Sequence, residues 1–236
     1  MSEIDWTPSD GDWETTLTGE MLMCGLLAKV LLSVPEREWI DPLLNDDVLA
    51  EAPFGNGQAA TQEGVKELER WTLNYRDGID DQGLKDIKID YTRLFTGMRK
   101  LPVVPWESVY FSEERMVFQE RTLSVRSWYR RYGLESVDLY KEPDDHIGLE
   151  ISFVGHLAGL ALTSLNQENP EEFESILDGQ CEFLSKHLLL WGHLWCSQMI
   201  MHAQTSFYRG IAYLTQGMLD EIAKIMNLDV PEFDAL

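Results

Sequence analysis

Apolar side chains recur at intervals of three and four residues along nearly the whole chain, and this spacing is the strongest constraint on its fold. Residues 80–96 show the pattern best, with one apolar stripe made of Leu84, Ile87, Tyr91, Leu94 and Phe95. No segment of four to eight residues alternates convincingly between apolar and polar side chains, as a half-buried strand would. The sequence therefore predicts an all-α fold, a single globular bundle of roughly 8 to 10 helices.

The segment from Pro143 to about Leu165 is apolar almost all round, which predicts a helix at the centre of the bundle. Pro143 suits the first position of that helix, and Asp144 and Asp145 would then lie in its first turn, where the helix dipole favours negative charge. The neighbouring carboxylates favour the charged form of His146, whereas the helix N-terminus opposes it. The sequence gives no net direction for the pKa of His146.

Other boundaries carry local signals. Gly133 closes a helical stretch that begins near Thr122, and Asn169 with Pro170 and Glu172 is a capping signature for the helix that follows. A break near residues 204–206 separates two C-terminal helices. Residues 101–106 (LPVVPW) contain prolines three residues apart, which disfavour a helix and predict an extended, rigid connector.

Length and composition fit one domain over residues 1–236, since 236 residues with 44% apolar content can bury a real core. The first eleven residues (MSEIDWTPSDG) are polar and acidic, without the basic and apolar regions of an export signal. We expect residues 1–14 to be flexible and the protein to be cytoplasmic. No window approaches about 18 uninterrupted apolar residues, so we expect no stable membrane insertion.

Charge is large and unevenly distributed. The net charge is −22, and residues 1–60 contain two cations against twelve carboxylates, whereas residues 85–131 contain ten Lys and Arg against six Asp and Glu. A surplus of this sign repels nucleic acid and anionic membranes, so we expect neither as a partner. It favours a basic partner, although surplus carboxylates also serve simply to keep a protein soluble.

Motifs for catalysis are scarce. Residues 55–60 (GNGQAA) match a dinucleotide-binding pattern in letters, but no strand precedes them, and no phosphate-binding loop with the GxxxxGK pattern is present. The three cysteines are far apart, without zinc-ligand spacing, and are expected to be buried thiols. His156 lies ten residues after His146, about 15 Å along a helix and too far for one metal ion. We therefore expect no enzymatic activity and no cofactor.

An enzymatic alternative remains, a helical metal-dependent hydrolase that uses Asp145, His146 and Glu150, of which His146 and Glu150 share a helix face. Apart from these residues, aromatic and apolar groups cluster around the connector and the start of the 143–165 helix. Their spacing alone favours core aromatics and capping acids rather than a binding site.

Three stretches in this region resemble the signatures of the TorD/DmsD family of redox-enzyme maturation chaperones. They are residues 90–97 (DYTRLFTG), 101–110 (LPVVPWESVY) and 142–148 (EPDDHIG). Residues 186–195 (KHLLLWGHLW) and 207–214 (FYRGIAYL) are similar to the closing helices of that family, so the resemblance covers roughly residues 80–226. A chaperone of the related nitrate-reductase branch is an alternative, and the PWESVY stretch favours TorD/DmsD.

The resemblance implies an all-helical cytoplasmic chaperone, a monomer or homodimer, that binds the twin-arginine leader and apoprotein of a molybdoenzyme catalytic subunit until its molybdopterin cofactor is inserted. A receptor for such a leader needs carboxylates beside an apolar groove. By resemblance, the leader-binding residues are Tyr91, Leu94, Phe95, Trp106, Glu107, Ser108, Tyr110, Glu142, Pro143, Asp145 and His146.

Overall fold

The computed structural model describes residues 13–45, 49–75, 77–96, 101–111, 120–134 and 143–231. Within these ranges it contains ten α-helices, one short π-helix and no strand, which confirms the all-α prediction. The elements are α1 (Trp13–Leu32), α2 (Arg37–Asn45), α3 (Ala59–Thr72), α4 (Asp81–Tyr91), η1 (Thr92–Thr96), α5 (Glu107–Tyr110), α6 (Glu120–Arg131), α7 (Ile147–Asn166), α8 (Pro170–Lys186), α9 (Leu188–His202) and α10 (Ser206–Ile225). Of the segment expected to be flexible, only Trp13 and Glu14 are described, and they begin α1.

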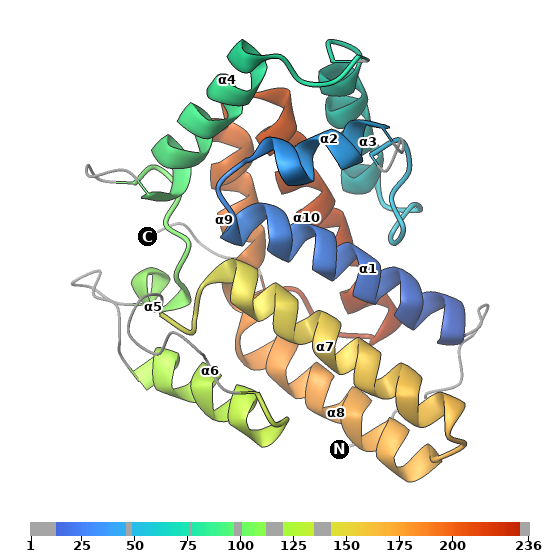
Figure 1. Cartoon of the computed structure of the whole chain (residues 1–236). Coiled ribbons are helices and arrows are strands. Elements are labelled where there is room, and N and C mark those ends of the chain that lie inside the picture. Colours follow the sequence, from blue (N-terminus) through green and yellow to red (C-terminus); the bar gives the residue numbers. More distant parts are fainter. Residues whose placement is uncertain are drawn as a thin grey trace.

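Two close helix pairs form the centre of the bundle. α1 packs along α7 and α3 along α10, while α8 lies against α7 and α9 against α10 (Figure 1). Glycine permits both close approaches. A Cβ atom on Gly155 of α7 would lie 2.7 Å from the Cβ atom of Cys24 on α1, and one on Gly64 of α3 would lie 3.0 Å from the carbonyl oxygen of Gly210 on α10.

The central position predicted for the helix that begins after Pro143 is confirmed. α7 buries side chains on most of its circumference, including Ile151, Phe153, Val154 and Leu157. α1 and α7 are also long and apolar enough to cross a membrane by length and composition alone. Because 50% and 61% of their apolar windows are buried and the two helices pack on each other, the core accounts for much of this apolar surface.

The predicted start of α7 is wrong by four residues. The helix begins at Ile147, with His146 as its N-cap, and Pro143 begins a turn in which its carbonyl oxygen accepts a hydrogen bond from the His146 amide (3.2 Å). The Ile147 amide donates to the Pro105 carbonyl (2.8 Å). This distant pairing holds residues 143–146 outside the helix, although the proline and the two aspartates suit a first turn.

The other helix ends lie where their local signals predicted them. The Asn169 side chain accepts a hydrogen bond from the Glu172 amide, and Pro170 is the first residue of α8. α6 ends at Arg131, and Gly133 follows with a φ of 75° that glycine adopts without strain. The break between α9 and α10 falls at residues 203–205.

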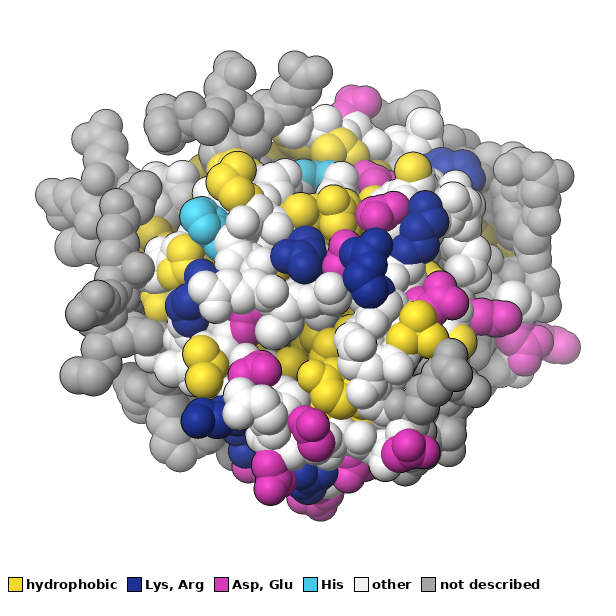
Figure 2. Space-filling model, turned by 90° about the horizontal axis from the view of Figure 1, so that it is seen from above, with side chains coloured by type: hydrophobic (Ala, Val, Ile, Leu, Met, Phe, Trp, Pro, Cys, Tyr) yellow, Lys and Arg dark blue, Asp and Glu magenta, His cyan; other side chains and the backbone are white. Residues whose placement is uncertain are grey.

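The face formed by α2, α3 and α4 carries Lys and Arg side chains beside acidic ones (Figure 2). Ion pairs explain this neighbourhood. Arg70 and Arg209 both pair with Glu67, and Arg37 pairs with Asp81. Among the described residues of this face, two arginines thus share one carboxylate and a third arginine has a carboxylate of its own.

Glu20 of α1 is an ionisable side chain inside the core, where it accepts a hydrogen bond from the side-chain amide of Gln180 on α8. Burial raises the pKa of Glu20 to about 8, and the hydrogen bond from Gln180 opposes this by a smaller amount. Glu20 is therefore protonated in the folded protein at neutral pH and ionised in the unfolded chain. Folding takes up a proton, so the stability contributed by this group falls as the pH rises from about 4.5 to about 8.

We predict that Glu20→Gln stabilises the protein at neutral pH, because glutamine keeps the hydrogen-bond acceptor and cannot ionise. The free energy of unfolding at pH 7 should rise by roughly 3 kcal/mol, since each pKa unit is worth about 1.4 kcal/mol. Denaturant titrations between pH 5 and 8 measure the effect, and the variant should depend less on pH than the parent. Glu171→Gln, at an exposed position of α8, is the control. An unchanged pH dependence in Glu20→Gln would contradict the proton uptake.

Candidate functional site

The connector and the turn before α7 are joined through their backbones. Trp106 and His146 form an isolated antiparallel bridge, the Glu107 amide donates to the Asp145 carbonyl (2.9 Å), and the Ile147 amide donates to the Pro105 carbonyl. The second and third stretches of the family resemblance are therefore direct neighbours in space. Sequence separation alone does not predict this contact.

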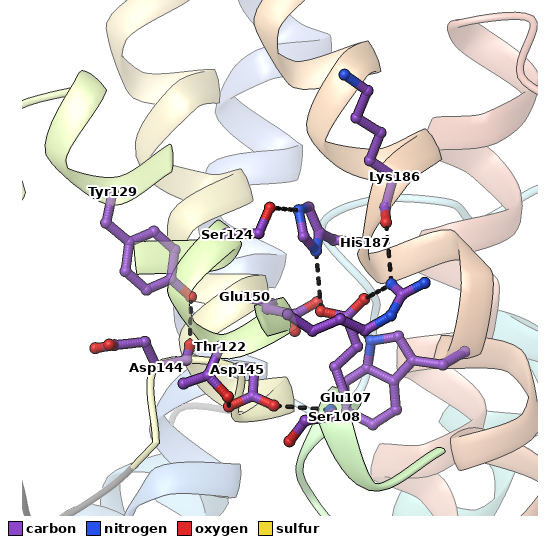
Figure 3. Close-up of polar contacts among 12 residues, drawn as sticks. Glu107, Ser108, Thr122, Ser124, Tyr129, Asp144, Asp145, Glu150, Lys186 and His187 are labelled. Atoms are coloured by element: carbon purple, nitrogen blue, oxygen red, sulfur yellow. Dashed lines mark hydrogen bonds and ion pairs between the residues drawn. The ribbon is translucent and has the colours of Figure 1, made fainter. Parts of the chain in front are cut away.

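Asp145 anchors this junction with its side chain. One carboxylate oxygen accepts a hydrogen bond from the Ser108 amide (2.8 Å) in the first turn of α5, and the other accepts one from the Thr122 hydroxyl (2.9 Å) in α6 (Figure 3). All three residues are buried. Asp145 thus fixes α5, α6 and the start of α7 relative to one another.

Glu107 is the second buried carboxylate, and it connects α5 to α6 and to the junction between α8 and α9. Arg121 donates to one of its oxygens, and Nδ1 of His187 lies 2.9 Å from the other (Figure 3). Nε2 of His187 lies 3.1 Å from the hydroxyl of Ser124. His187 is therefore a buried histidine that joins α5 and α6 to the junction between α8 and α9.

Asp144 is the third buried carboxylate, and α6 supplies its partners. The Arg126 side chain donates to the Asp144 carboxylate, and the Tyr129 hydroxyl donates to the Asp144 carbonyl (2.9 Å). Burial, followed by the nearby carboxylates, raises the pKa of Tyr129 well above its usual value. Tyr129 therefore stays a hydrogen-bond donor at any physiological pH.

Glu150 of α7 lies close to these carboxylates and carries no charge at neutral pH. Burial, reinforced by the charges of Glu107 and Asp145, raises the pKa of Glu150 well above its usual value. The indole of Trp191 donates to one Glu150 oxygen (3.3 Å), and the other oxygen has no hydrogen-bond partner. Protonation of Glu150 spares the site a further buried negative charge.

The pKa of His146 is lowered in the structure, so its imidazole is neutral at physiological pH. Burial lowers the pKa of His146 to about 3, and its Nδ1 accepts a hydrogen bond from the Gly148 amide (3.0 Å), so the imidazole caps the N-terminus of α7. An imidazolium could not accept this bond. His146 acts as a neutral cap beside the ring of Trp106 (6.5 Å between ring centroids).

Tyr91, Leu94 and Phe95 of the predicted site form a cluster that is separate from the connector. Tyr91 and Phe95, at the end of α4 and in η1, are buried and contact each other (5.3 Å between centroids), and Phe95 also contacts Trp195 (6.3 Å) and Tyr208 (5.9 Å). Leu94 is fully buried beside them. This placement is the core arrangement that their helical spacing favours.

Helix α9 contacts both the aromatic cluster and the connector. Trp191, Trp195 and Gln198 share one face of α9 at intervals of four and three residues. Trp191 contacts the ring of Tyr110 (5.1 Å between centroids), and the Tyr110 hydroxyl donates to the Val104 carbonyl (2.9 Å) and contacts the Gln198 side chain (3.0 Å). The face of α9 is thus one wall shared by both groups of predicted residues.

The structure therefore assigns the predicted residues to two neighbouring groups. The connector group contains Trp106, Glu107, Ser108, Tyr110, Pro143, Asp145 and His146, and the aromatic group contains Tyr91, Leu94 and Phe95. Only Trp106 and Tyr110 are partly exposed, and Glu142 lies outside the described residues. Sequence reasoning missed Arg121, Thr122 and Arg126 on α6 and the role of Trp191.

The alternative metal site finds no support in the described ranges. They contain no group of three or more His, Cys, Asp or Glu side chains placed to hold a metal ion. Both oxygens of Asp145 accept hydrogen bonds from the protein, and Nδ1 of His146 accepts one from Gly148. These atoms are engaged in holding α5, α6 and α7 together.

We predict that Asp145→Ala destabilises the protein by roughly 2–4 kcal/mol, because it leaves the buried Ser108 amide and Thr122 hydroxyl without their acceptor. Denaturant unfolding measures the change. Asp178→Ala, at an exposed position of α8, should change the stability by less than about 0.5 kcal/mol. Equal stability of the Asp145 variant and the parent would show that this carboxylate does not anchor the junction.

Comparison with known proteins gives one family. Residues 56–197, more than half of the chain, match the family described as nitrate reductase delta subunit. The chain is 28% identical over 172 residues to a Haemophilus influenzae protein named as a Tat proofreading chaperone, DmsD, which covers 70% of this chain and 77% of that protein. It is 27% identical over 142 residues to the chaperone protein TorD of Aliivibrio fischeri, covering 60% and 64%.

A third relative is the Tat proofreading chaperone DmsD of Salmonella typhimurium, 32% identical over 127 residues, covering 53% of this chain and 55% of the relative. The matches thus span between about half and three quarters of the relatives' own lengths. The family match over residues 56–197 includes the connector and the turn before α7, and it agrees with the resemblance found in the sequence. The chain belongs to the nitrate reductase delta subunit family, in the group formed by TorD and DmsD.

Proposed function

We propose that this protein is a cytoplasmic, single-domain chaperone for the maturation of a molybdopterin-dependent oxidoreductase. It binds the twin-arginine leader and the apoprotein of the enzyme's catalytic subunit until the cofactor is inserted, and it catalyses no reaction itself. The names of its relatives, which are TorD and DmsD chaperones, support this proposal. The observation that carries it is the junction of connector and turn, which joins two signature stretches into one structure.

Within this proposal the residues of the site have different tasks. Trp106 and Tyr110 are partly exposed, so they make the first contacts with the apolar segment of the leader. Glu107, Ser108, Pro143, Asp145 and His146 hold the connector in position and supply the carboxylates. Tyr91, Leu94 and Phe95 form the apolar floor against the same face of α9.

Charge supports the choice of ligand. A net charge of −22 attracts a basic peptide at long range, and the basic stretch of residues 85–131 does not oppose it, because several of its arginines pair with carboxylates of the protein. A leader combines two arginines with an apolar segment. Burying two or three large apolar side chains, less the cost of ordering a peptide, gives a dissociation constant of about 1 µM.

We predict that a synthetic twin-arginine leader binds, that most of the binding energy comes from its apolar segment, and that added salt weakens binding modestly. Calorimetry should compare the parent peptide, a twin-lysine peptide and a peptide whose apolar segment is made polar. The polar peptide should lose the most affinity. If it binds as well as the parent, the apolar contact is not the source of the energy.

Trp106→Ala should weaken leader binding by about tenfold or more, since an aromatic side chain at the centre of an interface contributes a few kcal/mol. Trp39→Ala is the matched control, because Trp39 is also partly exposed but lies on α2. Equal loss in both variants would indicate a general effect on folding. If Asp145→Ala and His146→Ala lower only the stability and leave leader affinity unchanged, these two residues are supports and not contacts.

A further inference from the structure

The carboxylates that suit a leader's arginines are already occupied by arginines of the protein. Arg121 pairs with Glu107, and Arg126 pairs with Asp144. Both arginines belong to α6, and both carboxylates are at most 1% exposed. An incoming arginine therefore meets, at either position, a carboxylate that already has a guanidinium partner.

Helix α6 also occupies the apolar surface next to these carboxylates. The ring of Trp128 contacts Phe183 of α8 (6.0 Å between centroids), and the ring of Tyr129 contacts Phe153 of α7 (4.9 Å). Val125, about one turn earlier on α6, is fully buried. α6 thus combines arginines on carboxylates with apolar side chains on an apolar wall, which is the chemistry that a twin-arginine leader would bring.

The two arginines of α6 remain within reach of solvent. The side chain of Arg121 is 32% exposed and that of Arg126 is 21% exposed, whereas their carboxylate partners are buried. Five residues of helix separate them by about 7.5 Å along its axis, a distance that two arginine side chains from adjacent residues can span. An external pair of guanidinium groups can therefore approach the same two carboxylates from the solvent side.

We propose that α6 is an internal ligand, which occupies the arginine subsites of the leader and the apolar surface beside them, and must be displaced when the leader binds. This inference rests on the proposed function and adds its regulation. The exchange replaces one guanidinium by another, so the buried carboxylates keep a cationic partner throughout. Because only the undocked form of α6 exposes the site, α6 lowers the apparent affinity of every ligand, the leader included, in proportion to the undocked fraction.

Hydrogen exchange on the unmodified protein tests the displacement directly. When the twin-arginine leader binds, the amides of residues 120–131 should exchange hydrogen faster, because α6 is displaced from its docked position. The amides of α8, residues 170–186, should not change in this direction and serve as the internal control. Slower or unchanged exchange in α6 with the leader bound would overturn the proposal.

A pair of double variants tests the competition. Arg121→Gln with Arg126→Gln removes the internal competitor, so leader affinity should increase by about tenfold if α6 leaves the site only a tenth of the time. Arg130→Gln with Arg131→Gln is the control on the same helix, with the same change in net charge but no contact with the buried carboxylates. Affinity should change by less than about twofold in the control, because its charge lies at the surface. A weaker or equal affinity in the first variant would overturn the proposal.

A synthetic peptide of residues 120–131 separates this inference from the proposed function. It should bind the Arg121→Gln, Arg126→Gln variant more tightly than the parent. If this peptide binds while no leader does, α6 is an internal ligand and the proposed client is wrong. If the leader binds the parent, but hydrogen exchange in α6 does not become faster and the double variant has unchanged leader affinity, the proposed client is supported and the proposal of an internal ligand is wrong. If neither peptide binds, both proposals fail.

Discussion

Asp145 is a carboxylate without access to water, and the geometry of the site depends on how it is satisfied. A buried charge is tolerated only when hydrogen bonds replace its hydration, and Asp145 obtains them from the Ser108 amide and the Thr122 hydroxyl. These donors lie on α5 and α6, while the aspartate precedes α7. The Asp145 side chain therefore positions three helices, and the position of the connector that carries Trp106 depends on them.

The helices were largely predictable because their signals are local. The Asn169 cap, Pro170 as the first residue of α8, and the stop after α6 at Gly133 each depend on residues within one or two turns. The start of α7 was not predictable in the same way. Pro143 and the two aspartates suit a first turn, but Ile147 donates its amide to Pro105, and no local pattern encodes that partner.

The membership of the candidate site stays a prediction from the resemblance, and the arrangement of its residues was not predictable from the sequence. Tyr91, Leu94 and Phe95 follow a helical spacing that core residues and the floor of a binding site share, so periodicity cannot separate the two. The arginines of α6 were not predicted as site residues, because arginines are common on surface helices. Their signal was the local excess of cations in residues 85–131 of an acidic chain. Three arginines of this stretch form ion pairs, with Asp90, Glu107 and Asp144.

Surface carboxylates and buried carboxylates have different roles: the first attract a basic client, and the second select among clients. Surface carboxylates act over a Debye length of about 8 Å at physiological ionic strength, so they draw in basic segments without reading their sequence. Glu107 and Asp144 are buried, and each accepts a hydrogen bond from a guanidinium, a group that carries several donors in a fixed plane. A lysine brings the same charge without that geometry. Discrimination between arginine and lysine should therefore arise at these two buried positions, while the remaining negative charge sets how quickly a client arrives.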